Sequence, residues 1–272
     1  MATASDTDKV FAGLVPKIYE THLVPLIFEP YAADLAERVR MENPSRVLEV
    51  AAGTGVVTRA LASTLPQSTS IVATDLNQTM LDQAELLGTS RRVEWRAADA
   101  MQLPFPDGTF DAVVCQFGVM FFPDKTKAFR EAHRVLSPGG IFIFNVWDRI
   151  EENEFADTVT TALASVFPSD PPRFMARTPH GYHNLVTIEQ DLAKGGFNHS
   201  VRIETVAARS RAESARAAAI AYCQGTPLRN EIEQRDASKL DAATDAATQA
   251  IADRFGADAV DGKIQAHVVV AA

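Results

Sequence analysis

The sequence contains Arg46-Val47-Leu48-Glu49-Val50-Ala51-Ala52-Gly53-Thr54-Gly55, followed directly by Val56-Val57-Thr58-Arg59-Ala60-Leu61-Ala62. The first run is apolar and predicts a buried strand, and the second run has the spacing of a helix. A buried parallel strand, a glycine turn and a helix N-terminus together form a binding site for a nucleoside-bearing cofactor. Glycines in such a turn would let backbone N–H groups approach the ligand where a Cβ would clash.

The next apolar run, Ser70-Ile71-Val72-Ala73-Thr74, ends at Asp75. An acid at the tip of the second strand is suited to bind the two hydroxyls of a ribose. Asp75 could also act as a charge or cap at the N-terminus of the following helix, near Asn77. Its spacing from the glycines favours the ribose role.

The glycine turn differs from that of a dinucleotide-binding protein. The nicotinamide fingerprint reads G-x-G-x-x-G, and its third glycine permits close packing of helix and strand. Here Thr58 stands at that place. The turn therefore favours an adenosine-type ligand without a pyrophosphate, and S-adenosylmethionine is the obvious candidate.

Further segments carry a family resemblance: Leu48–Gly55, Val72–Leu81, Ala98-Asp99-Ala100, Leu103–Asp111 and Leu136-Ser137-Pro138-Gly139-Gly140. In this order they resemble the class I S-adenosylmethionine-dependent methyltransferases, of the group similar to the ubiquinone/menaquinone C-methyltransferases (methyltransferase type 11-like). The motifs span about residues 46–147, and the resemblance is thin outside that window. One departure is Ala51, where the family usually has glycine; its extra methyl should narrow the space around the methionine part.

The alternation of apolar runs predicts a parallel sheet covered by helices on both faces. Strands are expected near 46–50, 70–74, 92–96, 111–116 and 140–147, with helices at 8–20, 23–41, 55–64, 77–87 and 124–136. Farther along we expect a strand–helix unit over 187–195 and 197–208, helices over 211–222 and 230–254, and an edge strand at 267–271. The resemblance implies a Rossmann-like three-layer α/β sandwich, whose seven-stranded sheet is mostly parallel with an antiparallel last strand.

We interpret residues 1–272 as a single methyltransferase domain with four parts. These are an N-terminal helical cover (8–41), a cofactor-binding core (46–147), a substrate lid inserted at 150–186, and the completion of the sheet with the C-terminal helices (187–272). Both 8–31 and 150–186 are expected to form a mobile lid, because water must be kept from the methyl group during transfer.

The resemblance implies roles for individual residues. Asp99 would accept the adenine amino group, although a turn aspartate is the alternative, and Leu76 and Met80 would sandwich the ring. Met80 could equally be a core residue of its helix. Glu49 would order the glycine loop and through it the methionine amine, with direct contact to the amine left open, and Gln116 would lie beside the methionine part or the acceptor. The full set of candidate cofactor-binding residues is Tyr19, Glu49, Ala51, Gly53, Gly55, Asp75, Leu76, Met80, Asp99, Ala100 and Gln116. The expected cofactor is S-adenosyl-L-methionine, with S-adenosyl-L-homocysteine as product.

Acceptor-side groups must come from segments outside these motifs. Tyr19 lies in the N-terminal helices, and His180 and His183 lie in the segment Thr178–Asn184. These three residues are the candidates for a catalytic base, each with an ordinary structural role as its alternative. The spacing of the two histidines is not a metal-binding signature, and no metal is expected.

Composition limits the partners. The formal net charge is −9, which disfavours a nucleic acid. Two cysteines, Cys115 and Cys223, provide no disulfide framework, which favours a reducing cytoplasm. No apolar run approaches the roughly 18 residues of a membrane span. We therefore expect a small-molecule acceptor, no nucleic acid and no membrane span, and a homodimer is left open.

Three functional hypotheses follow. The first is a small-molecule methyltransferase acting by in-line displacement. The second is a non-catalytic binding or partner protein of the same fold, and the third is an NAD-dependent oxidoreductase, which Thr58 opposes. The acceptor molecule and the acceptor atom are not readable from these residues.

Overall fold

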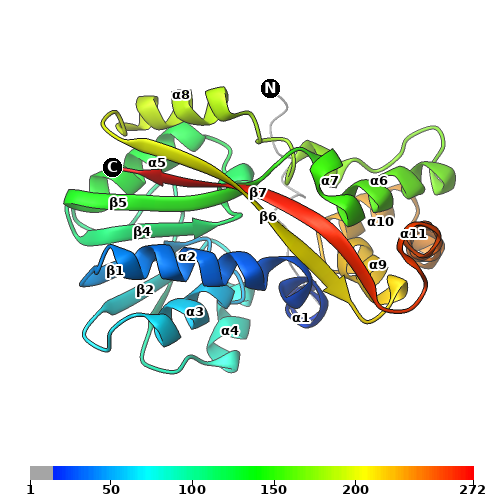
Figure 1. Ribbon diagram of the computed structural model, residues 1–272, viewed down its shortest axis with the longest axis horizontal. Helices are drawn as coiled ribbons and strands as arrows, with labels where there is room; N and C mark the ends of the chain where they lie inside the picture. Colours follow the sequence, from blue (N-terminus) through cyan, green and yellow to red (C-terminus); the bar gives the residue numbers. More distant parts are fainter. Residues whose placement is uncertain (1–14) are drawn as a thin grey trace. The chain divides into compact units, whose positions relative to one another are not determined.

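The computed structural model describes residues 15–272 (Figure 1), so the part of the expected helix 8–20 before residue 15 lies outside the described residues. The described chain divides into two compact units. Unit 1 comprises residues 15–28, Trp147–Tyr182 and Ala207–Ala266, and unit 2 comprises Glu29–Val146, His183–Val206 and His267–Ala272. Each unit is described by itself below.

Unit 2 holds the sheet and the strand–turn–helix motif. Its strands are β1 (Arg46–Val50), β2 (Ser70–Asp75), β3 (Glu94–Ala97), β4 (Phe110–Gln116) and β5 (Leu136–Trp147, whose last residue is in unit 1), with parts of β6 (Val201–Ala212) and β7 (Val260–Ala271). Its helices are α2 (Glu29–Met41), α3 (Val56–Thr64), α4 (Gln78–Leu87), the short η3 (Val119–Phe121), α5 (Lys125–Val135) and α8 (Leu185–Gly195).

The seven strands have the order β3-β2-β1-β4-β5-β7-β6. β1 pairs in parallel with β2 and β4, β2 with β3, and β4 with β5. β6 and β7 are antiparallel to each other: Thr205 bonds His267 at one point, and Ala272 N–H donates to Ser200 at another. This confirms the Rossmann-like sheet with an antiparallel last strand.

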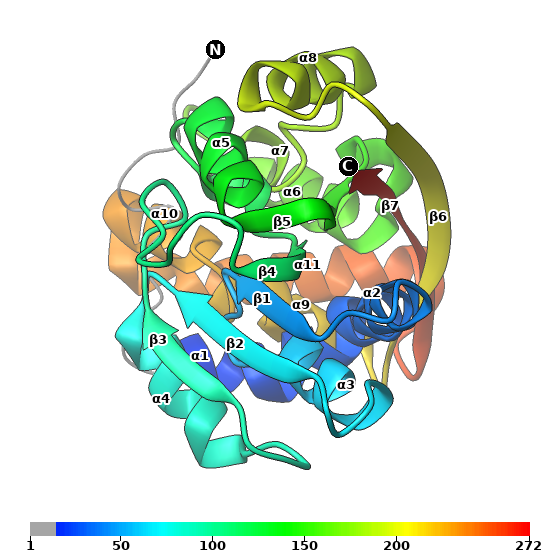
Figure 2. The same ribbon diagram turned by 90° about the vertical axis from the view of Figure 1, so that its left-hand side faces the viewer.

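Two helical layers cover this sheet within unit 2 (Figure 2). On one face, Leu35 and Val39 of α2 and Leu61 of α3 pack with Val47 and Ile143 in a single apolar cluster. On the other face, the ring of Phe129 in α5 lies 5.4 Å from that of Phe144. Alternate residues of β5 therefore face opposite layers, as the period of a strand requires.

Unit 1 is mostly helical. Its elements are α1 (Val15–Ile18), η2 (Tyr19–Phe28), η4 (Ile150–Glu152), α6 (Glu154–Val166), α7 (Phe174–Arg177), α9 (Ala215–Gln224), α10 (Leu228–Asp236), η5 (Ala237–Lys239) and α11 (Leu240–Phe255). Phe155 of α6 is fully buried, and its ring lies 4.9 Å from that of Phe255.

Several sequence-based boundaries need correction. The two N-terminal helices are one continuous helical run from Val15 to Met41, and its middle part, η2, is π-helical around Pro25. Proline lacks the N–H that an α-helix needs, and the wider π turn accommodates the loss. The expected helix 230–254 is interrupted by η5.

The C-terminal half holds two larger differences. The unit expected as strand then helix over 187–195 and 197–208 has the reverse order, with α8 first and β6 second. The expected edge strand at 267–271 is the end of the longer β7, which lies between β5 and β6. Strand position in a sheet depends on pairing with distant residues, and the local apolar pattern does not carry it.

Candidate cofactor-binding site

Asp75 ties the tip of β2 to the glycine turn. Its Oδ2 accepts a 2.8 Å hydrogen bond from the N–H of Gly53, and its Oδ1 accepts a 2.8 Å bond from the N–H of Asn77. Asn77 in turn caps α4, since its side chain accepts from the N–H of Thr79. Burial raises the pKa of Asp75, and the backbone N–H donors oppose that shift. The carboxylate thus orders both the turn and the start of α4, and it lies at the carboxyl edge where such sheets bind ligands.

Glu49, near the end of β1, is buried and paired with Thr58 of α3. The Thr58 hydroxyl donates a 2.6 Å hydrogen bond to Glu49 Oε2, and both side chains are inaccessible to solvent. Burial raises the pKa of Glu49 to about 8, and the negative charge of Asp75 adds to the shift. The hydroxyl of Thr58 acts in the opposite direction. Thr58 therefore provides the hydrogen-bond donor for the buried Glu49, at the position where a dinucleotide fingerprint would have glycine.

Gly53 and Gly55 both have positive φ, of 57° and 83°. A Cβ on Gly55 would lie 2.9 Å from Cη2 of Trp95 and 3.2 Å from Cβ of Ala84, so Gly55 permits close packing between the turn, β3 and α4. Glycine in this turn was expected to let backbone N–H groups approach a ligand, and the N–H groups of Gly53 and Gly55 themselves have partners within the protein. Gly53 donates to Asp75 and Gly55 donates to the carbonyl of Ala52.

Ala51 also has a positive φ, of 56°, which is uncommon for a residue with a Cβ. Its methyl group meets the loop after β4, where a Cβ on Gly118 would lie only 2.6 Å from that of Ala51. Next to it, Phe117 has φ of 49°, and its ring lies 5.3 Å from that of Tyr31. The turns after β1 and β4 are therefore in direct contact.

The candidate adenine residues follow β2 and β3. Leu76 is 66% exposed, which leaves an apolar surface beside Asp75, whereas Met80 is buried in α4. Asp99 Oδ1 accepts a 2.8 Å hydrogen bond from the N–H of Met101. This is the turn-stabilising role expected as the alternative to adenine binding. Among the described residues its Oδ2 accepts no hydrogen bond, so an adenine amino group could still be bound. Ala100 is half-buried in the same turn.

All these groups, with the half-buried Gln116 at the end of β4, lie in unit 2 at the carboxyl ends of β1 to β4. Two aspartates supply negative charge at this edge, Asp75 at the end of β2 and Asp99 after β3, while Glu49, with its pKa raised to about 8, adds little charge at neutral pH. This charge suits a cationic sulfonium and opposes a pyrophosphate, whose usual N–H donor on Gly53 is already taken. The residues present therefore fit S-adenosylmethionine.

The three acceptor-side candidates are divided between the units. Tyr19 and His180 belong to unit 1, and His183 belongs to unit 2, directly before α8. Tyr19 packs its ring 5.2 Å from that of Phe28 within η2. His180 is buried, lies 6.0 Å from the ring of Trp147, and has its Nδ1 2.8 Å from the carbonyl oxygen of Asp148. A carbonyl oxygen can only accept a hydrogen bond, so Nδ1 of His180 carries a proton. In the neutral imidazole the other ring nitrogen, Nε2, then has the free lone pair of a base.

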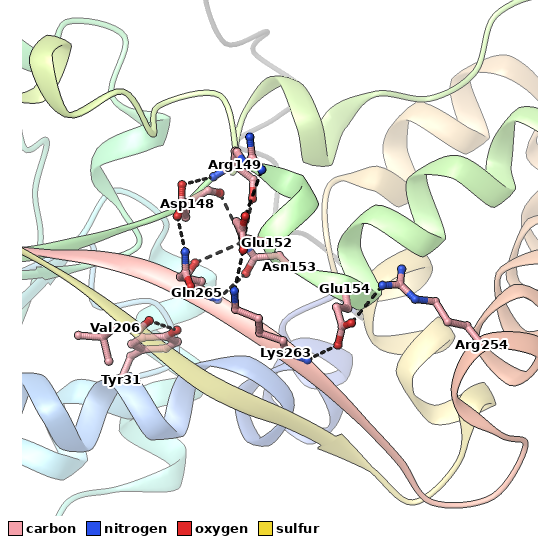
Figure 3. Close-up of polar contacts among 10 residues, drawn as sticks. All are labelled: Tyr31, Asp148, Arg149, Glu152, Asn153, Glu154, Val206, Arg254, Lys263 and Gln265. Atoms are coloured by element: carbon pink, nitrogen blue, oxygen red, sulfur yellow. Dashed lines mark hydrogen bonds and ion pairs between the residues drawn. The ribbon is translucent and has the colours of Figure 1, made fainter.

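The start of the expected lid is firmly anchored within unit 1 (Figure 3). Gln265 donates from Nε2 to Asp148 Oδ2 at 2.7 Å, and its backbone N–H donates to Asn153 Oδ1 at 3.0 Å. Lys263 pairs with Glu152 at 2.6 Å, and Arg254 pairs with Glu154 at 3.0 Å. These contacts with β7 and α11 hold the first residues of the 150–186 segment in place.

Two residues with a place in this site were not identified from the sequence. Thr58 enters the sequence argument only as the residue in place of the third glycine, and the available signal for its role is a hydroxyl three residues after Gly55. Asn145, near the end of β5, lies within the strand expected at 140–147, and the signal for it is that it is the single amide in the otherwise apolar run Ile141–Trp147. Residues 15–272 contain no group of three or more His, Cys, Asp or Glu that could hold a metal ion. None of the helices within that range is long and apolar enough to cross a membrane.

Comparison with known proteins identifies relatives. The methyltransferase-domain family matches residues 48–144. The chain is 31% identical over 186 residues to the ubiquinone/menaquinone biosynthesis C-methyltransferase UbiE of Pseudomonas savastanoi pv. phaseolicola, which covers 63% of this chain and 71% of that protein. It is 42% identical over 100 residues to the demethylmenaquinone methyltransferase of Deinococcus radiodurans, covering 36% of this chain and 41% of that protein.

The fold has solved counterparts as well. The YcgJ protein from Bacillus subtilis superposes with a TM-score of 0.55 at 18% identity, covering 89% of this chain and 97% of that chain. At this identity the likeness concerns the fold alone.

Proposed function

We propose that this chain, which belongs to the class I S-adenosylmethionine-dependent methyltransferases of the UbiE-like group, binds its cofactor across the carboxyl ends of β1 to β4. Asp75 would bind the ribose, and Asp99, Ala100, Leu76 and Met80 the adenine. Ala51, Gly53, Gly55, Glu49 and Gln116 would surround the methionine part, with Tyr19 as a further contact. The support is that these residues, other than Tyr19, all belong to unit 2 and stand at or just after the carboxyl ends of β1 to β4.

The enzyme transfers a methyl group from S-adenosylmethionine to a small-molecule acceptor. Bound in the site, the sulfonium supplies the methyl group in activated form, so little covalent chemistry is asked of the protein. The chain must place the acceptor in line behind the methyl carbon, at roughly 3 Å, and keep water out. Asp75 would favour the cationic cofactor through its negative potential, whereas Glu49, with its pKa raised to about 8, would act mainly as a hydrogen-bonding group.

One observation carries this assignment: the N–H of Gly53 is donated to Asp75 and is thereby unavailable for a phosphate. A carboxylate oxygen has two lone pairs, so Asp75 can hold the turn and still accept from ribose hydroxyls. The same hydrogen bond couples the position of the glycine turn to that of the ribose-binding carboxylate, because a shift of the Gly53 N–H or of Asp75 Oδ2 would displace the other.

For the acceptor side we propose that His180, His183 or Tyr19 supplies a general base if the acceptor is an oxygen or nitrogen. The buried His180 has the strongest support, because the carbonyl of Asp148 selects the tautomer with a basic Nε2. We further propose a single functional domain over 1–272, with 8–41 as cover, 46–147 as the cofactor core, 150–186 as lid and 187–272 completing the sheet. We also propose that the protein acts in the cytoplasm on a small-molecule acceptor and not on a nucleic acid. A homodimer is left open.

Calorimetric titration with S-adenosylhomocysteine tests the cofactor site. Asp75→Ala should weaken binding about 10–150-fold, because charge-assisted hydrogen bonds worth about 1.5–3 kcal/mol are lost. Asp107→Ala is the control, since Asp107 is an exposed partner of Arg134 in the loop before β4. Unchanged affinity in Asp75→Ala, or a melting shift with NAD and none with S-adenosylhomocysteine, would contradict the proposal. Methyl transfer to a metabolite extract separates an enzyme from a binding protein.

A further inference from the structure

Asn145 is a buried amide at the carboxyl edge of the sheet that the roles above leave unused. It lies third from the end of β5 and its side chain is fully buried. In the parallel register it stands directly beside Gln116, the last residue of β4. The carboxyl edge of adjacent parallel strands is where sheets of this kind bind ligands.

Only half of the Asn145 amide is satisfied. Oδ1 accepts a 2.9 Å hydrogen bond from the N–H of Phe117, which also approaches the backbone carbonyl of Asn145 at 3.3 Å. That N–H fixes the orientation of the amide, because a flipped side chain would place NH₂ against N–H. Within residues 15–272, Nδ2 has no hydrogen-bond partner. A buried donor without a partner costs about 1–3 kcal/mol, so such a group calls for a physical explanation.

The order of the strands indicates which part of a ligand would reach this donor. Asp99 follows β3 and Asp75 ends β2, and they are the proposed adenine and ribose groups. A cofactor with its adenosine at these tips extends its amino-acid end across β1 toward β4 and β5, since the order is β3-β2-β1-β4-β5. Nδ2 can only donate, so of the two charged groups at that end it would bind the carboxylate and not the ammonium.

The turn after β4 connects this amide to the glycine turn. The N–H that Oδ1 accepts belongs to Phe117, and the next residue, Gly118, is the one that faces the methyl group of Ala51. Asn145 thus holds the turn that contacts the cofactor loop while presenting a donor on its other branch. We propose that Asn145 Nδ2 donates a hydrogen bond to the carboxylate of the cofactor's methionine part. This inference rests on the proposed placement of the cofactor.

The test compares two ligands that differ in the amino-acid end. S-adenosylhomocysteine has the carboxylate, and 5′-deoxy-5′-methylthioadenosine lacks both carboxylate and ammonium. Asn145→Asp keeps an oxygen for the N–H of Phe117 and replaces the NH₂ donor with a carboxyl oxygen, which cannot donate to a carboxylate when ionised. We expect it to weaken S-adenosylhomocysteine binding about 10–150-fold in calorimetry and methylthioadenosine binding less than about 2-fold. Equal losses for both ligands, or no loss for either, would overturn the proposal.

Thr69→Val is the matched control. Thr69 is buried in the same unit and donates to the carbonyl of Pro44 at the opposite edge of the sheet, so its loss should alter neither affinity. Failure of the proposed cofactor site is distinguishable, because wild-type protein would then bind neither ligand.

A second measurement covers the case in which Asn145→Asp does not fold. In wild-type protein labelled with ¹⁵N-asparagine, the side-chain NH₂ signal of Asn145 is assigned through Asn145→Ser. It should shift on adding S-adenosylhomocysteine and stay in place on adding methylthioadenosine. A signal that moves equally with both ligands, or with neither, would overturn the proposal.

Discussion

The Cβ of Ala51 occupies the space that a side chain on Gly118 would need. A Cβ built on Gly118 would lie 2.6 Å from the Cβ of Ala51 and 2.8 Å from Sγ of Cys115. Gly118 has φ of −95°, so its backbone does not require glycine, and only the lack of space does. The methyl group of Ala51, at the position where the family resemblance implies glycine, is therefore matched by the absence of a methyl group on Gly118 in the neighbouring turn.

This relationship predicts a coupled pair of substitutions. Gly118→Ala should destabilise the fold by about 1–3 kcal/mol through overpacking. In the Ala51→Gly background the cost should be smaller, because one of the two clashing atoms is gone. Urea unfolding of the two single variants and the double variant measures the coupling. Additive effects would show that Cys115 alone sets the cost.

Ala51→Gly by itself should change stability little. Relief of the positive φ contributes about 1–2 kcal/mol, while the added freedom of the unfolded chain costs about 0.4–1 kcal/mol and some packing is lost. We expect a net change of about 1 kcal/mol or less in urea unfolding. A loss of about 3 kcal/mol would mean that the methyl group is a packing requirement and not a tolerated variation.

Thr58→Val should destabilise unit 2 by about 1–3 kcal/mol, since the buried carboxyl of Glu49 loses its hydroxyl partner. Thr58→Ser keeps the hydroxyl and serves as the control, with a smaller loss that reflects only the missing methyl. Denaturant unfolding at pH 7 compares the two. Equal losses would show that packing, and not the hydrogen bond, accounts for Thr58.

The free energy of unfolding should fall between pH 4.5 and about 8. Burial raises the pKa of Glu49 from 4.5 to about 8, so over this window the folded state keeps a proton that the unfolded state has lost. The stabilisation is complete below the unfolded pKa and is lost as pH rises through the folded one. The raised pKa of Asp75 acts in the same direction. Urea titrations at several pH values should show a shallower decline for Glu49→Gln, and an identical decline would refute the assignment.

Amide exchange tests the lid. Phe155, Val159 and Leu163 of α6 are fully buried in unit 1, and the residues before α6 are anchored by Gln265. Residues 154–166 should therefore exchange slowly with or without S-adenosylhomocysteine, as should β5. If the lid hypothesis holds, protection on ligand binding will be confined to the later part, about residues 167–184. Slow exchange there in the free protein, unaffected by ligand, would identify the whole segment as fixed cover.

Features that depend on neighbouring residues could be predicted from the amino-acid sequence. Arg46–Val50 forms a strand, Gly53 and Gly55 form the turn, and Val56–Thr64 forms a helix, because apolar periodicity and glycine act locally. Asp75 at the tip of β2 followed from strand length and spacing in the same way. The family followed from the order of these motifs.

Only the tertiary structure decided which distant groups meet. The bonds from Thr58 to Glu49 and from Phe117 to Asn145 join different elements, and no local pattern specifies such partners. The same holds for β7, whose place between β5 and β6 depends on pairing across the sheet. Local periodicity indicates which face of a helix or strand is buried. Which residues pack against that face depends on the whole chain, because the interior is packed as densely as a crystal of small organic molecules. For this reason the residues of the turn suffice to propose a cofactor site there, while the partners of its N–H groups and carboxylates come only from the tertiary structure.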